Sequence, residues 1–290
     1  MKRFILALAL LSATVRAETI AVKHVTIVDV NSGALVSNQT VVIDGHRIAS
    51  IGRNAPKHSR VIDATGKFLI PGLWDMHVHW YDKRYLPLFI ANGVTGIRQM
   101  WGNAEQRRWR QEMIGPRQVI GSTIIDGPKP IWPQSIVAKD AAEGRAAVIA
   151  EKKSGADFIK VYSLLPRDAF FAIADESKRQ HIPFVGHVPS TVRASEASDA
   201  GMKSMEHLLG VLLESSTNEE AIRKDLVAAA EEAAPASALM RVSRRHAKES
   251  IETYDPAKAA ALFARFVKNG TWHCPTLTVN RAVAYMDDPA

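Results

Sequence analysis

The stretch Pro71-Gly72-Leu73-Trp74-Asp75-Met76-His77-Val78-His79 begins at a turn and continues as a short strand that ends in two histidines. Side chains along a strand alternate between its two faces, so His77 and His79 project on the same side, about 7 Å apart along the strand axis. Two imidazoles at this spacing are close enough to bind one metal ion. A single His-x-His pattern also arises by chance, so the choice between a metal site and two unrelated histidines depends on the rest of the chain.

From Phe68 onward, short apolar strands alternate with amphipathic helical stretches, a pattern typical of a parallel sheet wrapped by helices. Four of the strands follow glycines suited to the left-handed position after a helix, namely Gly93, Gly155, Gly201 and Gly270. We expect strands over residues 69–79, 95–100, 118–124, 158–163, 184–188, 204–208 and 273–277. Seven such strands in succession predict an α/β protein with a (β/α)8 TIM-type barrel that lacks its last βα unit.

Upstream of the barrel, residues 18–67 are rich in β-branched side chains and interrupted by turn residues. Asn31-Ser32-Gly33, Asp44-Gly45 and Thr65-Gly66 stand where hairpins would reverse the chain. The segment therefore predicts a small antiparallel β unit, similar to an incomplete β-sandwich, followed by the barrel domain over residues 68–290.

A charged helical insertion, at about residues 209–256, separates the sixth predicted strand from the seventh. It emerges where a loop at the catalytic face of a barrel would lie. One interpretation is a lid over the site. The other is a helical decoration that packs on the rim, which we favour because most insertions are not gates.

The composition, 47% hydrophobic and 23% charged over 290 residues, is that of an ordinary globular protein and excludes disordered, collagenous and polytopic membrane proteins. A chain of this length buries a sufficient core without disulfides, and Cys274 is its only cysteine. The formal net charge is +7, and it falls to +4 without Lys2, Arg3 and Arg16 of the N-terminal segment. This charge is too mild, and the basic residues are too scattered, to indicate a nucleic-acid partner.

The N-terminus has the three parts of a secretory signal peptide over residues 1–17. Met1-Lys2-Arg3 is basic, residues 4–11 are apolar, and Val15-Arg16-Ala17 forms a cleavage site, with the cut expected after Ala17. The apolar run is far shorter than the roughly 20 residues that span a bilayer, and no later stretch is long enough. We therefore expect a secreted or periplasmic protein with no membrane span.

Three further candidate ligands fall at the ends of three different predicted strands: Lys160, His187 and His207. In a barrel these strand ends converge on one mouth, where chemistry takes place. A protonated lysine repels a cation, but a neutral lysine that has reacted with carbon dioxide becomes a carbamate, which is an anionic oxygen ligand. Together with His77 and His79, these positions favour a metal centre at the mouth of the barrel.

On these motifs the chain resembles the amidohydrolase superfamily, and within it the imidazolonepropionase-like and prolidase-like branch that includes Xaa-Pro dipeptidases. The resemblance covers residues 20–277 and includes Pro275-Thr276-Leu277, which is similar to the family's seventh strand. It implies metal ligands after the first, fourth, fifth and sixth barrel strands, namely His77, His79, Lys160, His187 and His207. It also implies one or two divalent ions, with zinc expected, and a carbamate on Lys160 that bridges them.

The resemblance further implies hydrolysis of a C–N bond by a metal-activated hydroxide, with the Lys160 carbamate in the catalytic centre. In the family an aspartate after the eighth strand carries the proton, and no residue of this sequence corresponds to it. We favour a dipeptidase, so a dipeptide or another small molecule is the expected substrate. The alternatives are a cyclic-amide hydrolase of the imidazolonepropionase type and a catalytically inactive fragment that only binds metal or ligand.

Residues next to these ligands are candidates for substrate binding. Tyr162 shares strand parity with Lys160 and is placed to donate to a substrate carbonyl. Arg98, at the end of the second strand, is placed to meet a substrate carboxylate. The pocket wall is expected from Trp101, Trp80 and Trp132, with ordinary packing as the alternative for each aromatic residue.

For the other polar residues near the motifs, the sequence indicates a role less specifically. Asp75 is expected either to orient a ligand or to make a polar contact in the barrel core. Glu206 neighbours His207 on the opposite strand face and is expected to be structural, while His273 and Cys274 are expected in the core. The remaining histidines are expected in solvent: His24, His46, His58, His181 and His246.

The sequence stops soon after the seventh predicted strand, in a polar tail with Asp287 and Asp288, neither of which we assign as the family's aspartate. A barrel of seven strands leaves two exposed edges, which invite aggregation or pairing with another chain. We therefore expect a truncated form of a longer protein that is poorly soluble and inactive by itself. A homo-oligomer is compatible with the same exposed edges.

Overall fold

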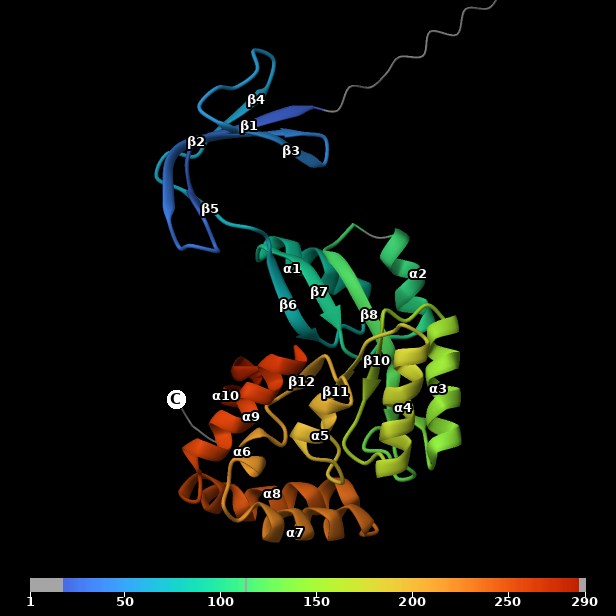
Figure 1. The fold of residues 1–290 in the computed structure, drawn as a ribbon. Coiled ribbons are helices and arrows are strands. Elements are labelled where there is room, and N and C mark those ends of the chain that lie inside the picture. Colours follow the sequence, from blue (N-terminus) through green and yellow to red (C-terminus); the bar gives the residue numbers. More distant parts are fainter. Residues whose placement is uncertain (1–17, 113, 287–290) are drawn as a thin grey trace, which may run out of the picture. The chain divides into compact units, whose positions relative to one another are not determined.

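The computed structural model describes residues 18–112 and 114–286. The chain falls into two compact units, one that ends at Gly72 and one that begins at Leu73 (Figure 1). The signal peptide predicted for residues 1–17, as well as Asp287 and Asp288, lies outside the described residues. In the described part of the chain, no helix is long and apolar enough to cross a membrane.

The first unit is a mixed five-stranded sheet. Its strands are β1 (Thr19–Val28), β2 (Leu35–Asp44), β3 (Arg47–Gly52), β4 (Arg60–Asp63) and β5 (Phe68–Leu69). They lie in the order β3-β2-β1-β4, and β5 also pairs with β1. The expected turns after β1 and β2 form antiparallel hairpins.

The expectation of a fully antiparallel unit was wrong for β4 and β5, which both run parallel to β1. β4 pairs with residues 20–23 of β1, and β5 pairs with Thr26 and Ile27 further along the same strand. The turn at Thr65-Gly66 therefore shifts the chain along one edge of β1 and does not reverse it. The short core of this unit centres on Val25, Val41 and Ala64.

The second unit contains the predicted barrel. Seven parallel strands lie in the order β13-β12-β11-β10-β8-β7-β6, and a short β9 (Ile136–Val137) pairs with β8. The strands are β6 (Leu73–Val78), β7 (Val94–Gln99), β8 (Arg117–Asp126), β10 (Phe158–Val161), β11 (Phe184–Gly186), β12 (Ser204–Glu206) and β13 (Trp272–Cys274). The prediction of seven barrel strands in a nearly closed TIM-type barrel is thus confirmed.

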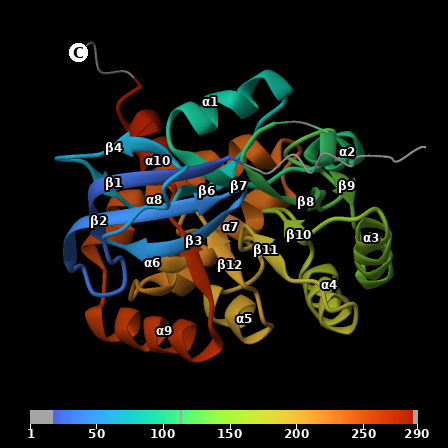
Figure 2. The ribbon, with the colours of Figure 1, turned by 90° about the horizontal axis from the view of Figure 1, so that it is seen from above.

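Helices follow the strands, and they cover the outside of the barrel except for the last one, which is exposed along its length (Figures 1 and 2). They are a 3-10 helix η1 (Lys83–Tyr85), α1 (Leu86–Ala91), α2 (Ala104–Glu112), α3 (Ala141–Lys153), α4 (Arg167–Arg179), α5 (Ala194–Asp199), α9 (Pro256–Asn269) and α10 (Leu277–Ala284). The main core lies between the strands and these helices and includes Ile159, Phe170 and Met205. The four glycines predicted after helices all have positive φ, as expected.

The predicted insertion contains α6 (Val211–Glu214), α7 (Glu219–Glu231) and α8 (Pro235–Glu252). α7 and α8 form a helical hairpin that packs on its own small core of Ala229, Ala238 and Val242. The hairpin lies beyond the carboxyl ends of the barrel strands (Figures 1 and 2). At its tip, Lys129 from the loop after β8 donates to the carbonyls of Glu231 and Glu232, at 3.2 and 3.0 Å.

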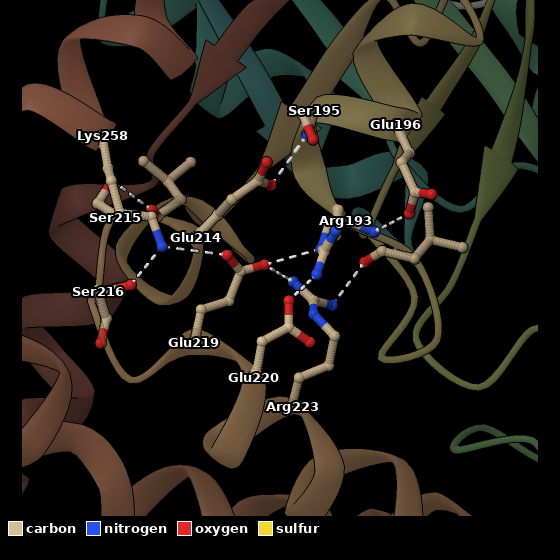
Figure 3. Close-up of polar contacts among 12 residues, drawn as sticks. Arg193, Ser195, Glu196, Glu214, Ser215, Ser216, Glu219, Glu220, Arg223 and Lys258 are labelled. Atoms are coloured by element: carbon tan, nitrogen blue, oxygen red, sulfur yellow. Dashed lines mark hydrogen bonds and ion pairs between the residues drawn. The ribbon is translucent and has the colours of Figure 1, made fainter.

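The base of the hairpin is held by Glu219, the first residue of α7 (Figure 3). Its buried carboxylate accepts hydrogen bonds from Arg193 and Arg223, both at 3.0 Å, and from Lys258 at 3.3 Å. Arg193 precedes α5 and Lys258 belongs to α9, so the carboxylate ties the insertion to two other parts of the barrel. The hairpin is thus anchored at both its base and its tip, and the rim decoration stays a prediction.

Candidate metal centre

The five residues predicted as metal ligands lie together at the carboxyl ends of four barrel strands. The ring centroid of His77 is 5.1 Å from that of His79 and 4.7 Å from that of His207. The ring of His187 lies 4.9 Å from that of His207 and stacks on Tyr162 at 3.9 Å. The Lys160 Nζ is 5.7 Å from the centroid of the Tyr162 ring. These side chains come from β6, β10, β11 and β12, as the strand-end argument expected.

His77 and His79 face each other through their Nε2 atoms, which lie 3.1 Å apart. The Nδ1 of His77 donates a hydrogen bond to Glu206 over 2.7 Å, so its Nε2 carries a lone pair. Two nitrogens bound to one tetrahedral zinc ion at about 2.0–2.1 Å would be about 3.3 Å apart. The pair therefore fits a shared cation.

His207 presents its Nε2 in the same way. The Thr276 hydroxyl donates to the Pro275 carbonyl at 2.8 Å, which leaves its oxygen to accept from Nδ1 of His207 at 2.7 Å. His187 has its Nδ1 bonded to the Ser163 hydroxyl at 2.8 Å. In both rings Nδ1 is thus occupied, and among the described residues no hydrogen bond is assigned to Nε2, the nitrogen that remains for a ligand.

Burial lowers the pKa of both of these rings, which favours the neutral form. Burial and the charges of neighbouring groups, Lys160 among them, hold the pKa of His187 well below its ordinary value. Burial, together with the charges of His77 and Lys160, lowers the pKa of His207 to about 4. Neutral imidazole is the form that binds a metal ion, so the electrostatics of the site fit a cation.

Lys160 is completely buried, and its Nζ has no hydrogen-bond partner among the described residues. Burial lowers the pKa of Lys160 to about 7, although the carboxylate of Glu206 opposes this shift. A substantial fraction of the amine is therefore neutral at neutral pH, which is the form that reacts with carbon dioxide. An unpartnered buried amine is costly, so the site fits a lysine that gains a partner through a carbamate and a metal ion.

The backbone around the ligands has positive φ angles, which residues with a side chain rarely adopt. His207 and Leu208 have φ values of 62° and 58°, and Thr276 has a φ of 47°. Gly186, directly before His187, has a φ of 135°. Such conformations cluster at functional sites because the surrounding structure holds them there.

Glu206 belongs to this centre, and the expectation that it faces away from His207 was wrong. Its fully buried carboxylate accepts hydrogen bonds from His77, Arg98 and Ser204, each at 2.7 Å. Strand alternation places Glu206 and His207 on opposite faces only within a strand. Because β12 ends at Glu206 and His207 has a left-handed backbone, both side chains reach the same centre.

The side chain of Arg98 is buried in the barrel interior, where all its assigned hydrogen bonds are to other parts of the chain. Its guanidinium donates to the Met76 carbonyl at 2.7 Å, to the Ser204 hydroxyl at 3.2 Å and to Glu206. This placement makes Arg98 a partner of Glu206. Its predicted contact with a substrate carboxylate stays a prediction.

Tyr162 and two tryptophans form an aromatic wall beside the ligands. Trp132 donates from Nε1 to the Tyr162 hydroxyl over 2.9 Å, which leaves the hydroxyl hydrogen of Tyr162 free to donate elsewhere. Burial raises the pKa of Tyr162, so this hydrogen is retained. Trp101 lies 5.8 Å from Trp132, and both line a cleft of about 560 Å³ with Tyr81. Trp80 instead packs in the core.

The remaining residues near the motifs have supporting positions. Asp75 accepts a hydrogen bond from the backbone N–H of His77 at 3.1 Å. Cys274 is paired with Glu206 in the register of β12 and β13, and burial raises the pKa of its thiol. His273 packs against Phe266, with ring centroids 4.6 Å apart, as expected of a core residue.

Curated proteins share parts of the sequence, although no known family model matches the chain. An adenine deaminase from Listeria monocytogenes is 35% identical over 83 residues, which cover 27% of this chain and 14% of the deaminase. A 5'-deoxyadenosine deaminase from Methanothrix thermoacetophila is 30% identical over 88 residues, which cover 30% of this chain and 18% of that enzyme. The aligned segments thus span less than a fifth of either relative.

Solved structures share the fold. A putative prolidase from Bifidobacterium longum superposes with a TM-score of 0.58 at 23% identity, covering 71% of this chain and 57% of the prolidase. A bottromycin amidohydrolase gives 0.55 at 23% identity, covering 88% and 65% of the two chains. A Xaa-Pro dipeptidase with bound methionine gives 0.57 at 18% identity, covering 89% and 78%. Shared fold and shared sequence segments together confirm the resemblance to the amidohydrolase superfamily that the strand-end motifs predicted.

Proposed function

We propose that this protein is a metal-dependent hydrolase that cleaves a C–N bond in a small substrate. The observation that carries the proposal is the convergence of His77, His79, Lys160, His187 and His207 at one end of the barrel. The rings of His77, His187 and His207 are bonded through Nδ1, and Nε2 of His77 faces Nε2 of His79. The prolidase and amidohydrolase neighbours, and the deaminase relatives, are by name proteins that act on C–N bonds.

His77 and His79 would hold one divalent ion, and His187 and His207 a second one. Lys160 would lie between them as a carbamate, with zinc as the proposed metal because imidazole and anionic oxygen suit it. Bound there, the metal would supply an activated water and polarise the scissile carbonyl.

The chain's own residues would position the substrate. The free hydroxyl hydrogen of Tyr162 would donate to the carbonyl oxygen where negative charge develops. Trp101 and Trp132 would pack against the apolar part of the substrate, in a cleft that none of the five proposed ligands lines and that adjoins the site through the contact of Trp132 with Tyr162. We propose a dipeptide, in keeping with the prolidase-type neighbours.

Hydrolysis of a cyclic amide is the alternative within the same chemistry. A second candidate is removal of an amino group from a purine-like ring, which the sequence identity with the two deaminases favours. The three candidates share the metal centre and differ only in what the aromatic cleft holds, so fold alone does not separate them.

The test is a substrate panel assayed with the metal-reconstituted protein. Dipeptides with and without a C-terminal proline, cyclic imides and adenine are offered with zinc, cobalt or manganese in bicarbonate buffer. The chain has no counterpart of the family's aspartate, so we expect any turnover of dipeptides by the parent chain to be low, and we expect the His77→Ala, His79→Ala double variant to abolish it. The exposed His46 and His58 provide the control, since their double alanine variant keeps the metal centre. Turnover of only imides or only adenine would replace the dipeptide, and equal activity of both double variants would overturn the metal centre.

We also propose that the protein is exported. The basic start, apolar segment and cleavage site of residues 1–17 support this proposal. Expression with the native leader and sequencing of the mature N-terminus tests it, and we expect the mature chain to begin at Glu18. A cytoplasmic product that still carries Met1 would refute export.

A further inference from the structure

Glu206 is a buried carboxylate that contacts a proposed metal ligand without being one of the five ligands. One of its oxygens, Oε2, accepts from Nδ1 of His77 at 2.7 Å. The other, Oε1, accepts from Arg98 and from the Ser204 hydroxyl, both at 2.7 Å. The carboxylate is fully buried, so these three donors determine its orientation.

The first consequence concerns the tautomer of His77. A neutral imidazole carries its proton on either Nδ1 or Nε2, and the hydrogen bond to one nitrogen decides which form prevails. An ionised carboxylate can only accept, so Glu206 holds the proton on Nδ1. The lone pair then lies on Nε2, which is the atom that faces Nε2 of His79 at 3.1 Å.

The second consequence concerns the ligand strand itself. Arg98 donates from one nitrogen to Glu206 and from Nε to the carbonyl of Met76, the residue directly before His77. Asp75 accepts from the backbone N–H of His77 at 3.1 Å. Glu206 therefore holds the ring of His77 at Nδ1, while Arg98 and Asp75 hold the carbonyl and the N–H of the peptide group that precedes His77.

We propose that Glu206, held by Arg98 and Ser204, is a positioning residue that selects the metal-binding tautomer of His77 and thereby sets the metal affinity of the His77 and His79 pair. The inference rests on the proposed function in one respect, since it assumes that a metal ion binds there. Carboxylates that accept from a metal-binding histidine typically change metal affinity by about 10–100-fold when they are removed.

The first experiment compares two substitutions of buried carboxylates. Glu206→Gln keeps the size of the side chain but replaces the acceptor-only carboxylate with an amide. The matched control is Glu151→Gln in α3, because Glu151 is also buried, accepts from the Thr123 N–H at 3.0 Å and lies 3.6 Å from Arg107. Zinc affinity is measured by competition with a chelator, and the cobalt derivative is followed by its absorption spectrum.

We expect Glu206→Gln to weaken zinc binding at one site by about 10–100-fold and to change the cobalt spectrum, and Glu151→Gln to leave both unchanged. Parent-like affinity and an unchanged cobalt spectrum in Glu206→Gln would overturn the positioning role while leaving the proposed function intact. A parent chain that binds no metal in bicarbonate would overturn the metal centre and this role with it.

A second measurement needs no metal and guards against a variant that fails to fold. Long-range proton–nitrogen NMR spectra of the metal-free parent report the protonated nitrogen of each ring, with His77 assigned by loss of its signals in His77→Gln. We expect the Nδ1-protonated form for His77 in the parent and in Ser204→Ala, which keeps the carboxylate and removes only one donor to Oε1, and a mixture of tautomers in Glu206→Gln. A His77 ring protonated on Nε2 in the parent would overturn the proposal.

Discussion

The Nδ1 atom of His207 lies 2.7 Å from the hydroxyl oxygen of Thr276, although 69 positions separate the two residues in the sequence. Both residues have a left-handed backbone, with φ values of 62° and 47°. The turn after β13 therefore orients a proposed metal ligand at the end of β12.

This relationship predicts that Thr276→Ala weakens metal binding at the His187 and His207 pair by about five- to tenfold, since one hydrogen bond is worth about 1 kcal/mol. Chelator competition measures the affinity. Thr276→Ser retains the hydroxyl and is expected to bind metal like the parent. Equal weakening by both substitutions would show that the methyl group matters and not the hydroxyl.

Gly186 makes room for Lys160. A Cβ atom at position 186 would lie 2.2 Å from the Val161 carbonyl oxygen and 3.1 Å from Cδ of Lys160. We expect Gly186→Ala to lower the free energy of unfolding by about 3 kcal/mol or more, because the residue would be both strained and overpacked. Gly201 has a φ of 92° with open space around it, so Gly201→Ala should cost only about 1 kcal/mol. Chemical denaturation compares the two, and similar losses would contradict the steric argument.

Lys160 should make metal loading depend on carbon dioxide. We expect the parent chain to take up fewer metal ions when it is reconstituted without bicarbonate, because the carbamate cannot form. Lys160→Ala should lose at least one ion in either buffer, whereas Lys152→Ala, which changes an exposed lysine of α3, should load like the parent. Elemental analysis gives the metal content. If the metal content changes neither without bicarbonate nor in Lys160→Ala, this lysine is structural.

Tyr162→Phe removes the hydroxyl but keeps a ring that can stack on His187. If Tyr162 donates to the reacting carbonyl, we expect kcat/KM to fall by about 100-fold, within the range measured for loss of one such donor. The metal content should not change. Loss of metal in step with activity would instead assign Tyr162 a role in holding His187.

His246 in α8 should give the helical hairpin a pH-dependent stability. Its ring bonds to Glu249 at 2.6 Å and to Asp225 of α7 at 2.9 Å, and these hydrogen bonds raise its pKa above 6.5. The folded state therefore binds the proton more tightly than the unfolded state does. The stabilisation is complete below about pH 6.5 and is lost as the pH rises through the folded pKa.

Hydrogen exchange of the α7 and α8 amides, corrected for the intrinsic rates, measures this effect at about pH 6 and about pH 8.5. We expect less protection at the higher pH in the parent and a smaller difference in His246→Gln. Arg245→Gln is the control, because it removes a different contact, of 2.7 Å, to the same Asp225. Identical profiles for the parent and His246→Gln would exclude His246 as the cause.

The sequence predicted the positions of the proposed ligands well, because these positions follow from the local pattern of apolar strands. Each proposed ligand stands at the end of an apolar run, and parallel strands of a barrel bring such ends to one mouth. The same reasoning missed Glu206, because it assumed that alternation continues past the end of β12. It also placed Arg98 at the mouth, since a strand-end position says nothing of the carboxylate that binds its guanidinium.

The sequence by itself determined the barrel strands, the glycines after helices and the set of side chains that meet at the centre, because these depend on periodicity and on the order of strands. Only the tertiary structure decided which nitrogen of each ring is free and which carboxylate supports it. The hydrogen bond between His77 and Glu206 joins residues 129 positions apart, on β6 at one end of the sheet order and on β12, next to the other end. No local pattern encodes such a contact, since it exists only once the sheet has curved far enough for β6 to approach β12.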